Sequence, residues 1–218
     1  MKLRLGSLRC VLVIAPHPDD ETIGAYALMT RLQRRGIEVR ILVVTDGGAS
    51  HTASPKWPRH RLIRERQHET LRAVRPLGIF RRDVTFLGLP DGRLVHQTRC
   101  ANRLIAGAIR RAPKPLLVIA PGHSDDHPDH RVVANAVGNT RFARVRGLAY
   151  PVWPAGAAIR HARAVTLSAQ ERLAKRRTIC SYRTQAGRID DDPNGFVMTR
   201  QQIAAFSRPV EIFVERVR

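Results

Sequence analysis

Short apolar segments alternate with longer amphipathic segments along this chain, and this alternation constrains the fold more than any other feature. Five Val-, Ile- and Leu-rich segments are typical of buried strands: residues 10–15, 39–45, 84–87, 116–120 and 148–150. Helical spacing of apolar side chains predicts helices at residues 22–35, 59–74, 98–111 and 128–140, the first ending at Gly36. A last helix at 169–182 and a last strand at 210–214 follow. The pattern predicts an α/β fold with right-handed crossovers and a mostly parallel sheet.

The size and composition of the chain indicate one compact unit. With 218 residues and 43% hydrophobic content, the chain can bury one core, so we expect a single domain over residues 1–218. No run of about 18 apolar residues exists, so no membrane span is expected. Cys10, Cys100 and Cys180 are odd in number and widely spaced, which favours free thiols and a cytoplasmic location.

The chain is strongly basic, with a formal net charge of +20 that comes almost entirely from arginine. The arginines are spread along the whole sequence, and aromatic residues make up only 5%, so nucleic acid is not an expected partner. Guanidinium groups bind phosphate and carboxylate bidentately, which favours a small substrate with an anionic group. The oligomeric state is not predicted.

Two clusters of His and Asp follow two of the predicted strands. The first lies in VLVIAPHPDDETIG, residues 11–24, and the second in VIAPGHSDDHPDHR, residues 118–131. Both begin directly after an Ala-Pro pair at the end of a strand. Ligands of open parallel sheets bind beyond the carboxyl ends of the strands, so the two clusters are predicted to face one crevice.

The residue types in these clusters favour a metal site. Imidazole nitrogen and carboxylate oxygen suit zinc and other divalent ions, and a catalytic zinc commonly has three protein ligands and one open position. His17 and Asp20, three residues apart, and His130 from the second cluster make such a set. Each motif alone is a weak signal, because an Asp at this point also caps helices. Glu21 is expected only to stabilise the positive end of the following helix.

The two motifs, unbroken here, resemble those of the LmbE-like or PIG-L family of N-acetylglucosaminyl deacetylases. The first is PHPDDE at residues 16–21 and the second is HPDH at residues 127–130. Further similarity lies in VVTDG at 43–47, the Arg66 helix, FLGLPDG at 86–92 and KRRTICSYRTQ at 175–185. In the last segment Thr178, Tyr182 and Thr184 depart from the family pattern, which has a histidine at the position of Tyr182.

The resemblance implies a three-layer, Rossmann-like fold and a zinc-dependent hydrolase of amide bonds. The positions matching the family's metal ligands are His17, Asp20 and His130. The positions matching its catalytic groups are Asp19, His127 and Asp129. Asp19 would be the general base toward the attacking water, and His127 would stabilise the oxyanion or protonate the leaving amine. Asp129 would orient a neighbouring histidine and keep it cationic.

Other matches concern the substrate. Arg66 and Asp91 match positions near the sugar pocket. Many members carry an acidic residue after the segment at 43–47, where this chain has Gly48-Ala49-Ser50, so that contact with a sugar hydroxyl would come from elsewhere. Asp125 matches the acidic residue that the family pattern has two residues before HPDH. His123 is expected to line the pocket or face solvent.

Three functional hypotheses follow. The first is removal of an N-acetyl group from an N-acetylglucosamine-type sugar or glycoconjugate, with zinc or another divalent metal. The alternative is an amidase that acts on another acylated amine, for example a thiol-conjugated glucosamine amide. The third is a basic, non-catalytic binding module. Residues 51–58 and 189–195 are predicted to be mobile loops because of their Pro, Ser, Asp and Gly content.

Overall fold

The computed structural model describes residues 5–157, 159 and 162–215, so both ends of the predicted domain lie outside the described residues. The strands form one sheet in the order β3-β2-β1-β4-β5-β7-β6. They are β1 Cys10–Ala15, β2 Glu38–Thr45, β3 Val84–Leu89, β4 Leu116–Pro121, β5 Val145–Tyr150, β6 Arg163–Thr166 and β7 Val210–Glu215. Strands β1 to β5 run parallel, β7 is antiparallel to β5, and β6 is antiparallel to β7. The predicted α/β class with a mostly parallel sheet is confirmed.

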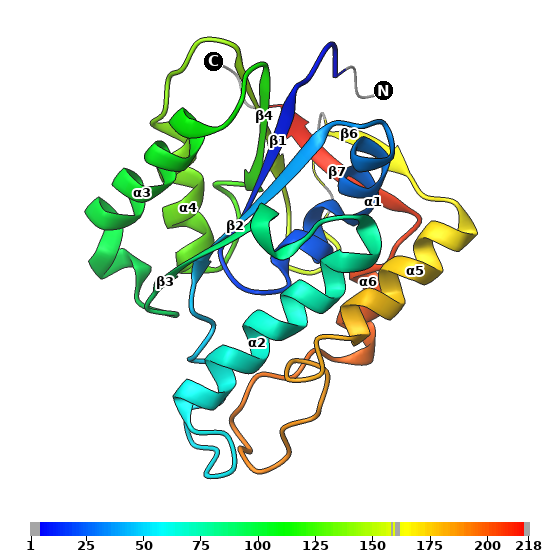
Figure 1. Cartoon of the computed structure of the whole chain (residues 1–218). Helices are drawn as coiled ribbons and strands as arrows, with labels where there is room; N and C mark the ends of the chain where they lie inside the picture. The colour runs from blue at the N-terminus through cyan, green and yellow to red at the C-terminus, as the bar shows by residue number, and fades with distance from the viewer. Residues whose placement is uncertain (1–4, 158, 160–161, 216–218) are drawn as a thin grey trace.

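Helices cover both faces of the sheet and give the molecule three layers (Figure 1). They are α1 Asp20–Arg34, α2 Arg59–Val74, α3 Thr98–Arg111, α4 Pro128–Gly138, α5 Ala169–Cys180 and α6 Arg200–Phe206. Helices α3 and α4 pack on one face, and α1, α5 and α6 pack on the other. Short 3₁₀ turns occur at Arg75–Leu77, Arg81–Asp83 and Leu94–Gln97.

The sheet is buried on both faces because successive strand residues point to opposite helical layers. In β1, Val11, Val13 and Ala15 join the core under α1, whereas Cys10, Leu12 and Ile14 join the core under α3 and α4. All six are buried. Burial on both faces explains why the strand reads as a continuous apolar run rather than as an alternating one.

Most predicted elements occupy the expected positions. Helices α2 and α3 match their predicted ranges, and α1 begins at Asp20, two residues earlier than predicted. Gly36 follows the end of α1 with φ +75°, a left-handed conformation that favours glycine. Strand β6 and helix α6 were not predicted, since segments of 4 and 7 residues are too short to show a clear period.

The loops at 51–58 and 189–195 are fastened to each other. Asp192 Oδ2 accepts a hydrogen bond of 2.9 Å from the Ala53 amide. The carboxylate of Asp191 accepts two further hydrogen bonds from the first loop. The Asp and Ser residues that led us to predict mobile loops are therefore the residues whose side chains join the two loops.

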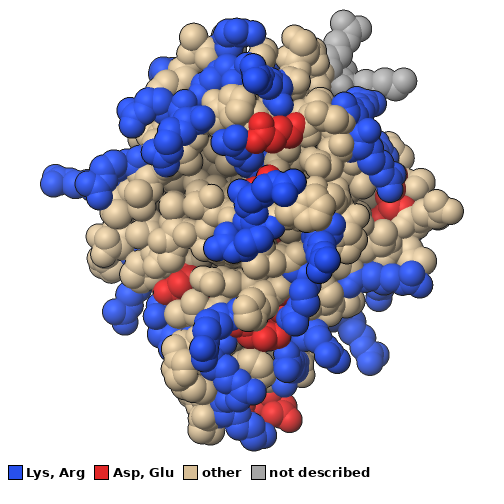
Figure 2. Space-filling view, in the orientation of Figure 1, with Lys and Arg blue, Asp and Glu red and all other residues tan. Residues whose placement is uncertain are grey.

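The surface carries the basic residues that the composition predicts. Figure 2 shows lysine and arginine side chains scattered over the visible face rather than gathered in one patch. Within the part of the chain that the structure describes, no helix has the length and apolar character needed to cross a membrane.

Candidate metal centre and substrate pocket

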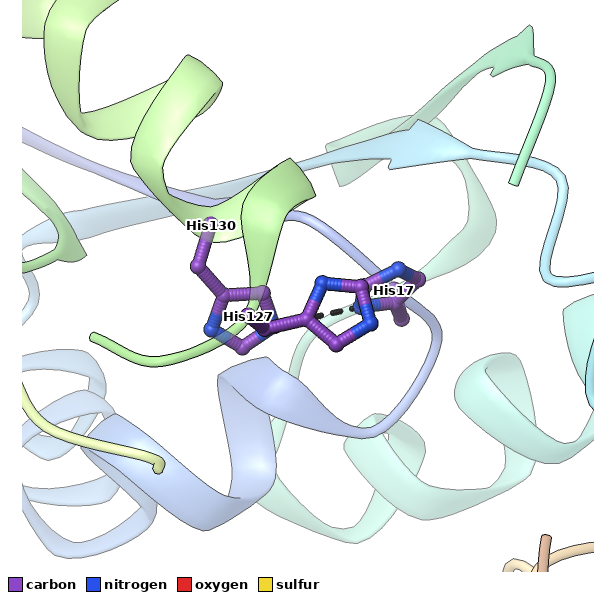
Figure 3. Close-up of side chains that lie close together, drawn as sticks. All are labelled: His17, His127 and His130. Carbon is purple, nitrogen blue, oxygen red and sulfur yellow. Dashed lines mark hydrogen bonds between the residues drawn. The ribbon is translucent and has the colours of Figure 1, made fainter. Parts of the chain in front are cut away.

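Strands β1 and β4 are neighbours in the centre of the sheet, and their carboxyl ends bring the two His/Asp clusters together. His17 lies in the turn between β1 and α1. His127 and His130 lie at the start of α4. The three imidazoles converge at this edge of the sheet, with ring centroids 4.7–5.2 Å apart (Figure 3). Segments more than 100 residues apart in sequence thus form one site.

Three donor atoms form a nearly equilateral triangle. His17 Nδ1, Asp20 Oδ2 and His130 Nε2 are 3.2 Å from one another in all three pairs. In a tetrahedral zinc site, bonds of about 2.0–2.2 Å place neighbouring donors about 3.3–3.6 Å apart. The triangle is therefore close to the size that zinc requires, and its two nitrogens and one carboxylate oxygen are donors that zinc and related divalent ions accept.

Each histidine of this triangle has a carboxylate beside its other ring nitrogen. His17 Nε2 lies 3.3 Å from Asp129 Oδ2 and 3.1 Å from Asp91 Oδ1. His130 Nδ1 lies 3.1 Å from Asp125 Oδ2. Metal-binding histidines are commonly oriented by a carboxylate in this way, because it fixes the ring and makes the other nitrogen a better ligand.

Two other sets of side chains also lie close enough to share a metal ion: His17, His127 and His130, and His17, Asp91 and Asp129. The carboxylates of Asp91 and Asp129 are held in place by hydrogen bonds from the backbone. Asp129 accepts from the amides of Gly92 and Leu94, at 2.8 and 3.1 Å, and Asp91 accepts from Ala49 at 2.9 Å. The Asp91 and Asp129 carboxylates are thus held beside His17, where they can orient its ring, and the triangle has the donors and spacing needed to hold a metal ion.

The triangle is strongly charged. Burial alone lowers the pKa of His17, but hydrogen bonds with Asp129 and Asp20 raise this pKa well above its usual value. Burial likewise opposes the charge on His130, yet Asp20 and Asp125 raise its pKa to about 9. The pKa of Asp20 is lowered, since the charge of His130 outweighs the effect of burial. The surrounding carboxylates favour positive charge at this point, which a divalent cation also supplies.

Asp19 lies beside the triangle with a strained backbone. Its φ of 127° is rare for a residue with a side chain, and such strain is concentrated at functional sites. The Asp19 amide donates to Glu21 Oε2 at 3.1 Å, and Arg66 Nη2 donates to Asp19 Oδ2 at 3.3 Å. Burial raises the pKa of Asp19 to about 8 although the charge of Arg66 acts in the opposite direction.

Glu21 does more than the sequence suggested. We expected it only to stabilise the start of a helix, but it is completely buried. Its Oε1 accepts a hydrogen bond from the Tyr182 hydroxyl, while Oε2 accepts from the Asp19 amide. Burial raises the pKa of Glu21 to about 7. Tyr182, which replaces the histidine of the family pattern, thus supports the carboxylate that holds the Asp19 backbone.

The state of His127 corrects an expectation. Its Nδ1 accepts a hydrogen bond of 3.2 Å from the Asp129 amide, so a neutral ring carries its proton on Nε2. Burial and the charges of His17 and His130 lower the pKa of His127 to about 4. We expected Asp129 to orient a neighbouring histidine and keep it cationic, and the histidine beside its carboxylate is His17, whose pKa it raises. The lowered pKa of His127 favours a neutral ring, whereas a protonated ring was expected for its role at the oxyanion.

A pocket of about 340 Å³ opens beside the triangle. The predicted residues His17, Asp19, Asp20, Arg66, Asp91 and His127 line it, whereas the buried His130 and Asp129 lie behind this surface. Further lining residues were not predicted: Ile23, Ala49, Ser50, Gly92, Trp153, Gln185, Asn194, Phe196 and Met198. His123 is exposed, with its Nδ1 2.9 Å from Asn135 Oδ1, which agrees with its expected absence from the metal site.

The sequence profile of one protein family, described as GlcNAc-PI de-N-acetylase, or PIG-L, matches residues 12–140. The chain belongs to the PIG-L family. It is 34% identical over 129 residues to diacetylchitobiose deacetylase of Thermococcus kodakarensis, an alignment that covers 58% of this chain and 46% of that protein. It is 31% identical over 133 residues to a probable N-acetyl-alpha-D-glucosaminyl L-malate deacetylase 2 of Bacillus anthracis, covering 59% and 58%. The matched part spans about half the length of these relatives.

A solved structure extends the similarity of fold beyond the PIG-L profile. The N,N'-diacetylchitobiose deacetylase from Pyrococcus horikoshii superposes with a TM-score of 0.73 at 21% identity, covering 96% of this chain and 84% of that chain. The fold of this PIG-L protein is therefore shared over almost its whole length. The pocket residues from Trp153 to Met198, by contrast, lie outside the profile match at 12–140, and of these only Gln185 belongs to a segment that resembles the family, residues 175–185.

Proposed function

We propose that this chain is a zinc-dependent deacetylase that hydrolyses the acetamide of an N-acetylglucosamine-type sugar. The observation that carries the proposal is the triangle of His17, Asp20 and His130 donors at 3.2 Å, beside Asp19 in one pocket. The deacetylase relatives support the choice of reaction. One sheet carries the pocket, and its lining runs from residue 17 to residue 198, so we treat the described residues as one catalytic unit.

Zinc, when bound to the triangle, supplies Lewis acidity that polarises the amide carbonyl and makes water acidic enough to be deprotonated near neutral pH. Asp19 then accepts a proton from the attacking water while the new carbon–oxygen bond forms. The carbonyl oxygen takes up the negative charge. Arg66 holds the Asp19 carboxylate, and Glu21 holds its backbone, in the position needed for this transfer.

His127 stabilises the developing oxyanion as a neutral donor. Because its Nδ1 accepts the Asp129 amide, Nε2–H is available to donate a hydrogen bond toward the pocket. Preorganised donors of this kind contribute a large share of the stabilisation in acyl transfer.

Collapse of the tetrahedral species breaks the carbon–nitrogen bond. Asp19 returns its proton to the departing nitrogen, so the products are the free sugar amine and acetic acid, which ionises at neutral pH. The cycle consumes one water and leaves Asp19 as a carboxylate. Arg66 and Asp91 line the pocket beside the triangle. We propose that they border the space that the sugar occupies.

The test is an assay of acetate release with zinc-loaded protein and a panel of N-acetylated sugars, including N-acetylglucosamine and diacetylchitobiose. We expect acetate and free amine in equal amounts. The same sugars carrying propionyl or larger acyl groups distinguish a deacetylase from a general amidase. Zinc-loaded, folded protein that releases no acid from any of these amides would overturn the proposal.

A further inference from the structure

The pocket has an aromatic wall, formed by Trp153, Phe196 and Met198. The rings of Trp153 and Phe196 meet edge to face, with centroids 6.0 Å apart and an interplanar angle of 89°. Phe196 remains 37% exposed, so part of its ring is accessible from the pocket. An exposed aromatic side chain in a pocket is a contact site for an apolar surface.

Trp153 is fixed relative to the metal centre. Its amide donates to Asp125 Oδ2 at 3.1 Å, the same oxygen that lies 3.1 Å from His130 Nδ1. Its ring also packs against Phe206, with centroids 5.3 Å apart. One carboxylate therefore positions both a metal donor and one side of the aromatic wall.

The segment that carries Phe196 is also held in place. The Phe196 amide donates to the Ser50 carbonyl at 2.8 Å. Gly195 packs so closely on the His51 ring that a Cβ there would lie 2.2 Å from His51 Cδ2. The Met198 amide donates to the Gln185 carbonyl at 2.8 Å. The backbone is thus anchored while the Phe196 ring stays free to contact a ligand, so little ordering is needed on binding.

The pocket offers poor complementarity to an anion. Arg66 is the one lysine or arginine among the described lining residues, and it is only 3% exposed. Its Nη1 and Nη2 donate to the Gly47 and Pro18 carbonyls and to Asp19, and its Nε is buried. Asp91 adds negative charge nearby. The arginines that favoured an anionic substrate lie across the molecular surface instead (Figure 2).

We propose that Trp153 and Phe196 form a subsite for an uncharged aglycone that presents an apolar ring face. The inference rests on the proposed function and narrows its substrate class to neutral N-acetylglucosaminides. Either an aryl group or the C–H face of a second pyranose supplies the required surface. Phosphate and carboxylate conjugates are disfavoured because Arg66, the one lysine or arginine among the described lining residues, is buried and already paired.

The test compares kcat/KM for methyl and phenyl N-acetylglucosaminides of the same anomer, diacetylchitobiose and N-acetylglucosamine 1-phosphate. The phenyl glycoside should exceed the methyl glycoside by about tenfold, from an added aromatic contact. The 1-phosphate should be the poorest substrate. Diacetylchitobiose shows whether a second pyranose is accepted as well as an aryl ring. A preference for the 1-phosphate, or equal values for methyl and phenyl, would contradict the proposal.

Variants of Phe196 test whether its ring causes the difference in kcat/KM between the phenyl and methyl glycosides. Phe196→Ala should reduce the phenyl-to-methyl ratio to about one, and Phe196→Leu, which keeps apolar volume, should reduce it in part. Val197→Ala is the matched control, because Val197 is exposed on the same segment and does not line the pocket. An unchanged ratio in folded Phe196→Ala would show that the ring is not the subsite.

A binding measurement separates failure of the subsite from failure of the proposed function. The chain has two tryptophans, so emission from Trp57→Phe protein reports Trp153 alone. Phenyl glucosaminide, the deacetylated amine, should quench this emission at about tenfold lower concentration than methyl glucosaminide. If no acetylated sugar is hydrolysed but this difference persists, the deacetylase function is wrong and the subsite stands. Equal affinities would overturn the subsite.

Discussion

The candidate metal centre, which is the triangle of His17, Asp20 and His130, and the aromatic wall face the same pocket but are built in different ways. The donors of the metal centre are buried, contact one another and are backed by carboxylates. The wall is fixed mainly through backbone hydrogen bonds, and its Phe196 ring remains accessible. Rigid, desolvated groups suit a reaction, whereas an accessible ring on an anchored backbone suits recognition of varied ligands.

The two regions also differ in their place along the chain. The metal centre lies within residues 12–140, where the PIG-L profile matches, and the wall comes from residues 153–198 beyond it. Central strands β1 and β4 position the first, and loops after β5 and α5 position the second. We call the region of the metal-donor triangle the reacting end of the pocket and the aromatic wall its selecting end. Substitutions at the two ends should have different effects on kcat and KM.

The largest effect is expected from His130→Ala, which removes a donor from the triangle. Bound zinc should fall from about one ion per chain toward zero, and turnover should fall by at least about a thousandfold. Metal analysis and acetate release measure the two losses. His123→Ala is the control, since this exposed histidine lies outside the triangle. Stoichiometric zinc in His130→Ala would show that the ligand set is wrong.

Asp19→Asn should separate chemistry from metal binding. The amide keeps the size of the side chain but cannot accept the proton, so kcat should fall by about a hundred- to ten-thousandfold. Zinc content and the thermal midpoint of unfolding should stay close to those of the wild type. Full turnover in this variant would remove Asp19 from the reaction.

Asp125→Asn acts on the contact between the two regions. Loss of the charge behind His130 should weaken zinc affinity by about ten- to a hundredfold. It should also raise KM for phenyl glycosides, since the same oxygen accepts the Trp153 amide. Competition with a metal chelator measures the first change, and Asp126→Asn, an exposed neighbouring acid, is the control. Unchanged zinc affinity would mean that Asp125 supports only the wall.

Asp192→Ala should have the smallest effect and alter only the selecting end. It removes hydrogen bonds to the amides of Ala53 and Asn194, at 2.9 and 3.1 Å. We expect KM to rise by about two- to tenfold, as the loss of one or two hydrogen bonds allows, with zinc content unchanged. Steady-state kinetics test this, with exposed Asp190→Ala as the control. A loss of zinc in Asp192→Ala would contradict the proposal that the reacting and selecting ends of the pocket act separately.

Most of the reacting end could be predicted from the sequence. Strand and helix periods placed both clusters at strand ends, and the rule for parallel sheets placed those ends together. The contacts between individual side chains could not be predicted from the sequence. That Asp129 pairs with His17, and that Tyr182 reaches Glu21, depends on packing between elements distant in sequence.

The selecting end was not predicted for the same reason. Phe196 faces the pocket because its amide binds Ser50 and because Gly195 packs on His51, and neither contact leaves a periodic signal in the sequence. Composition alone led us to expect an anionic substrate, whereas Arg66 is the one arginine among the described lining residues and is buried.

The central claim is that the triangle holds a catalytic metal, and metal titration tests it most directly. Protein stripped by a chelator is mixed with increasing zinc, while bound zinc and acetate release from an N-acetylglucosaminide are measured together. We predict no acetate release from metal-free protein and a linear recovery that ends at one zinc per chain. Full activity without metal, or zinc that binds at one ion per chain without restoring turnover, would contradict the account.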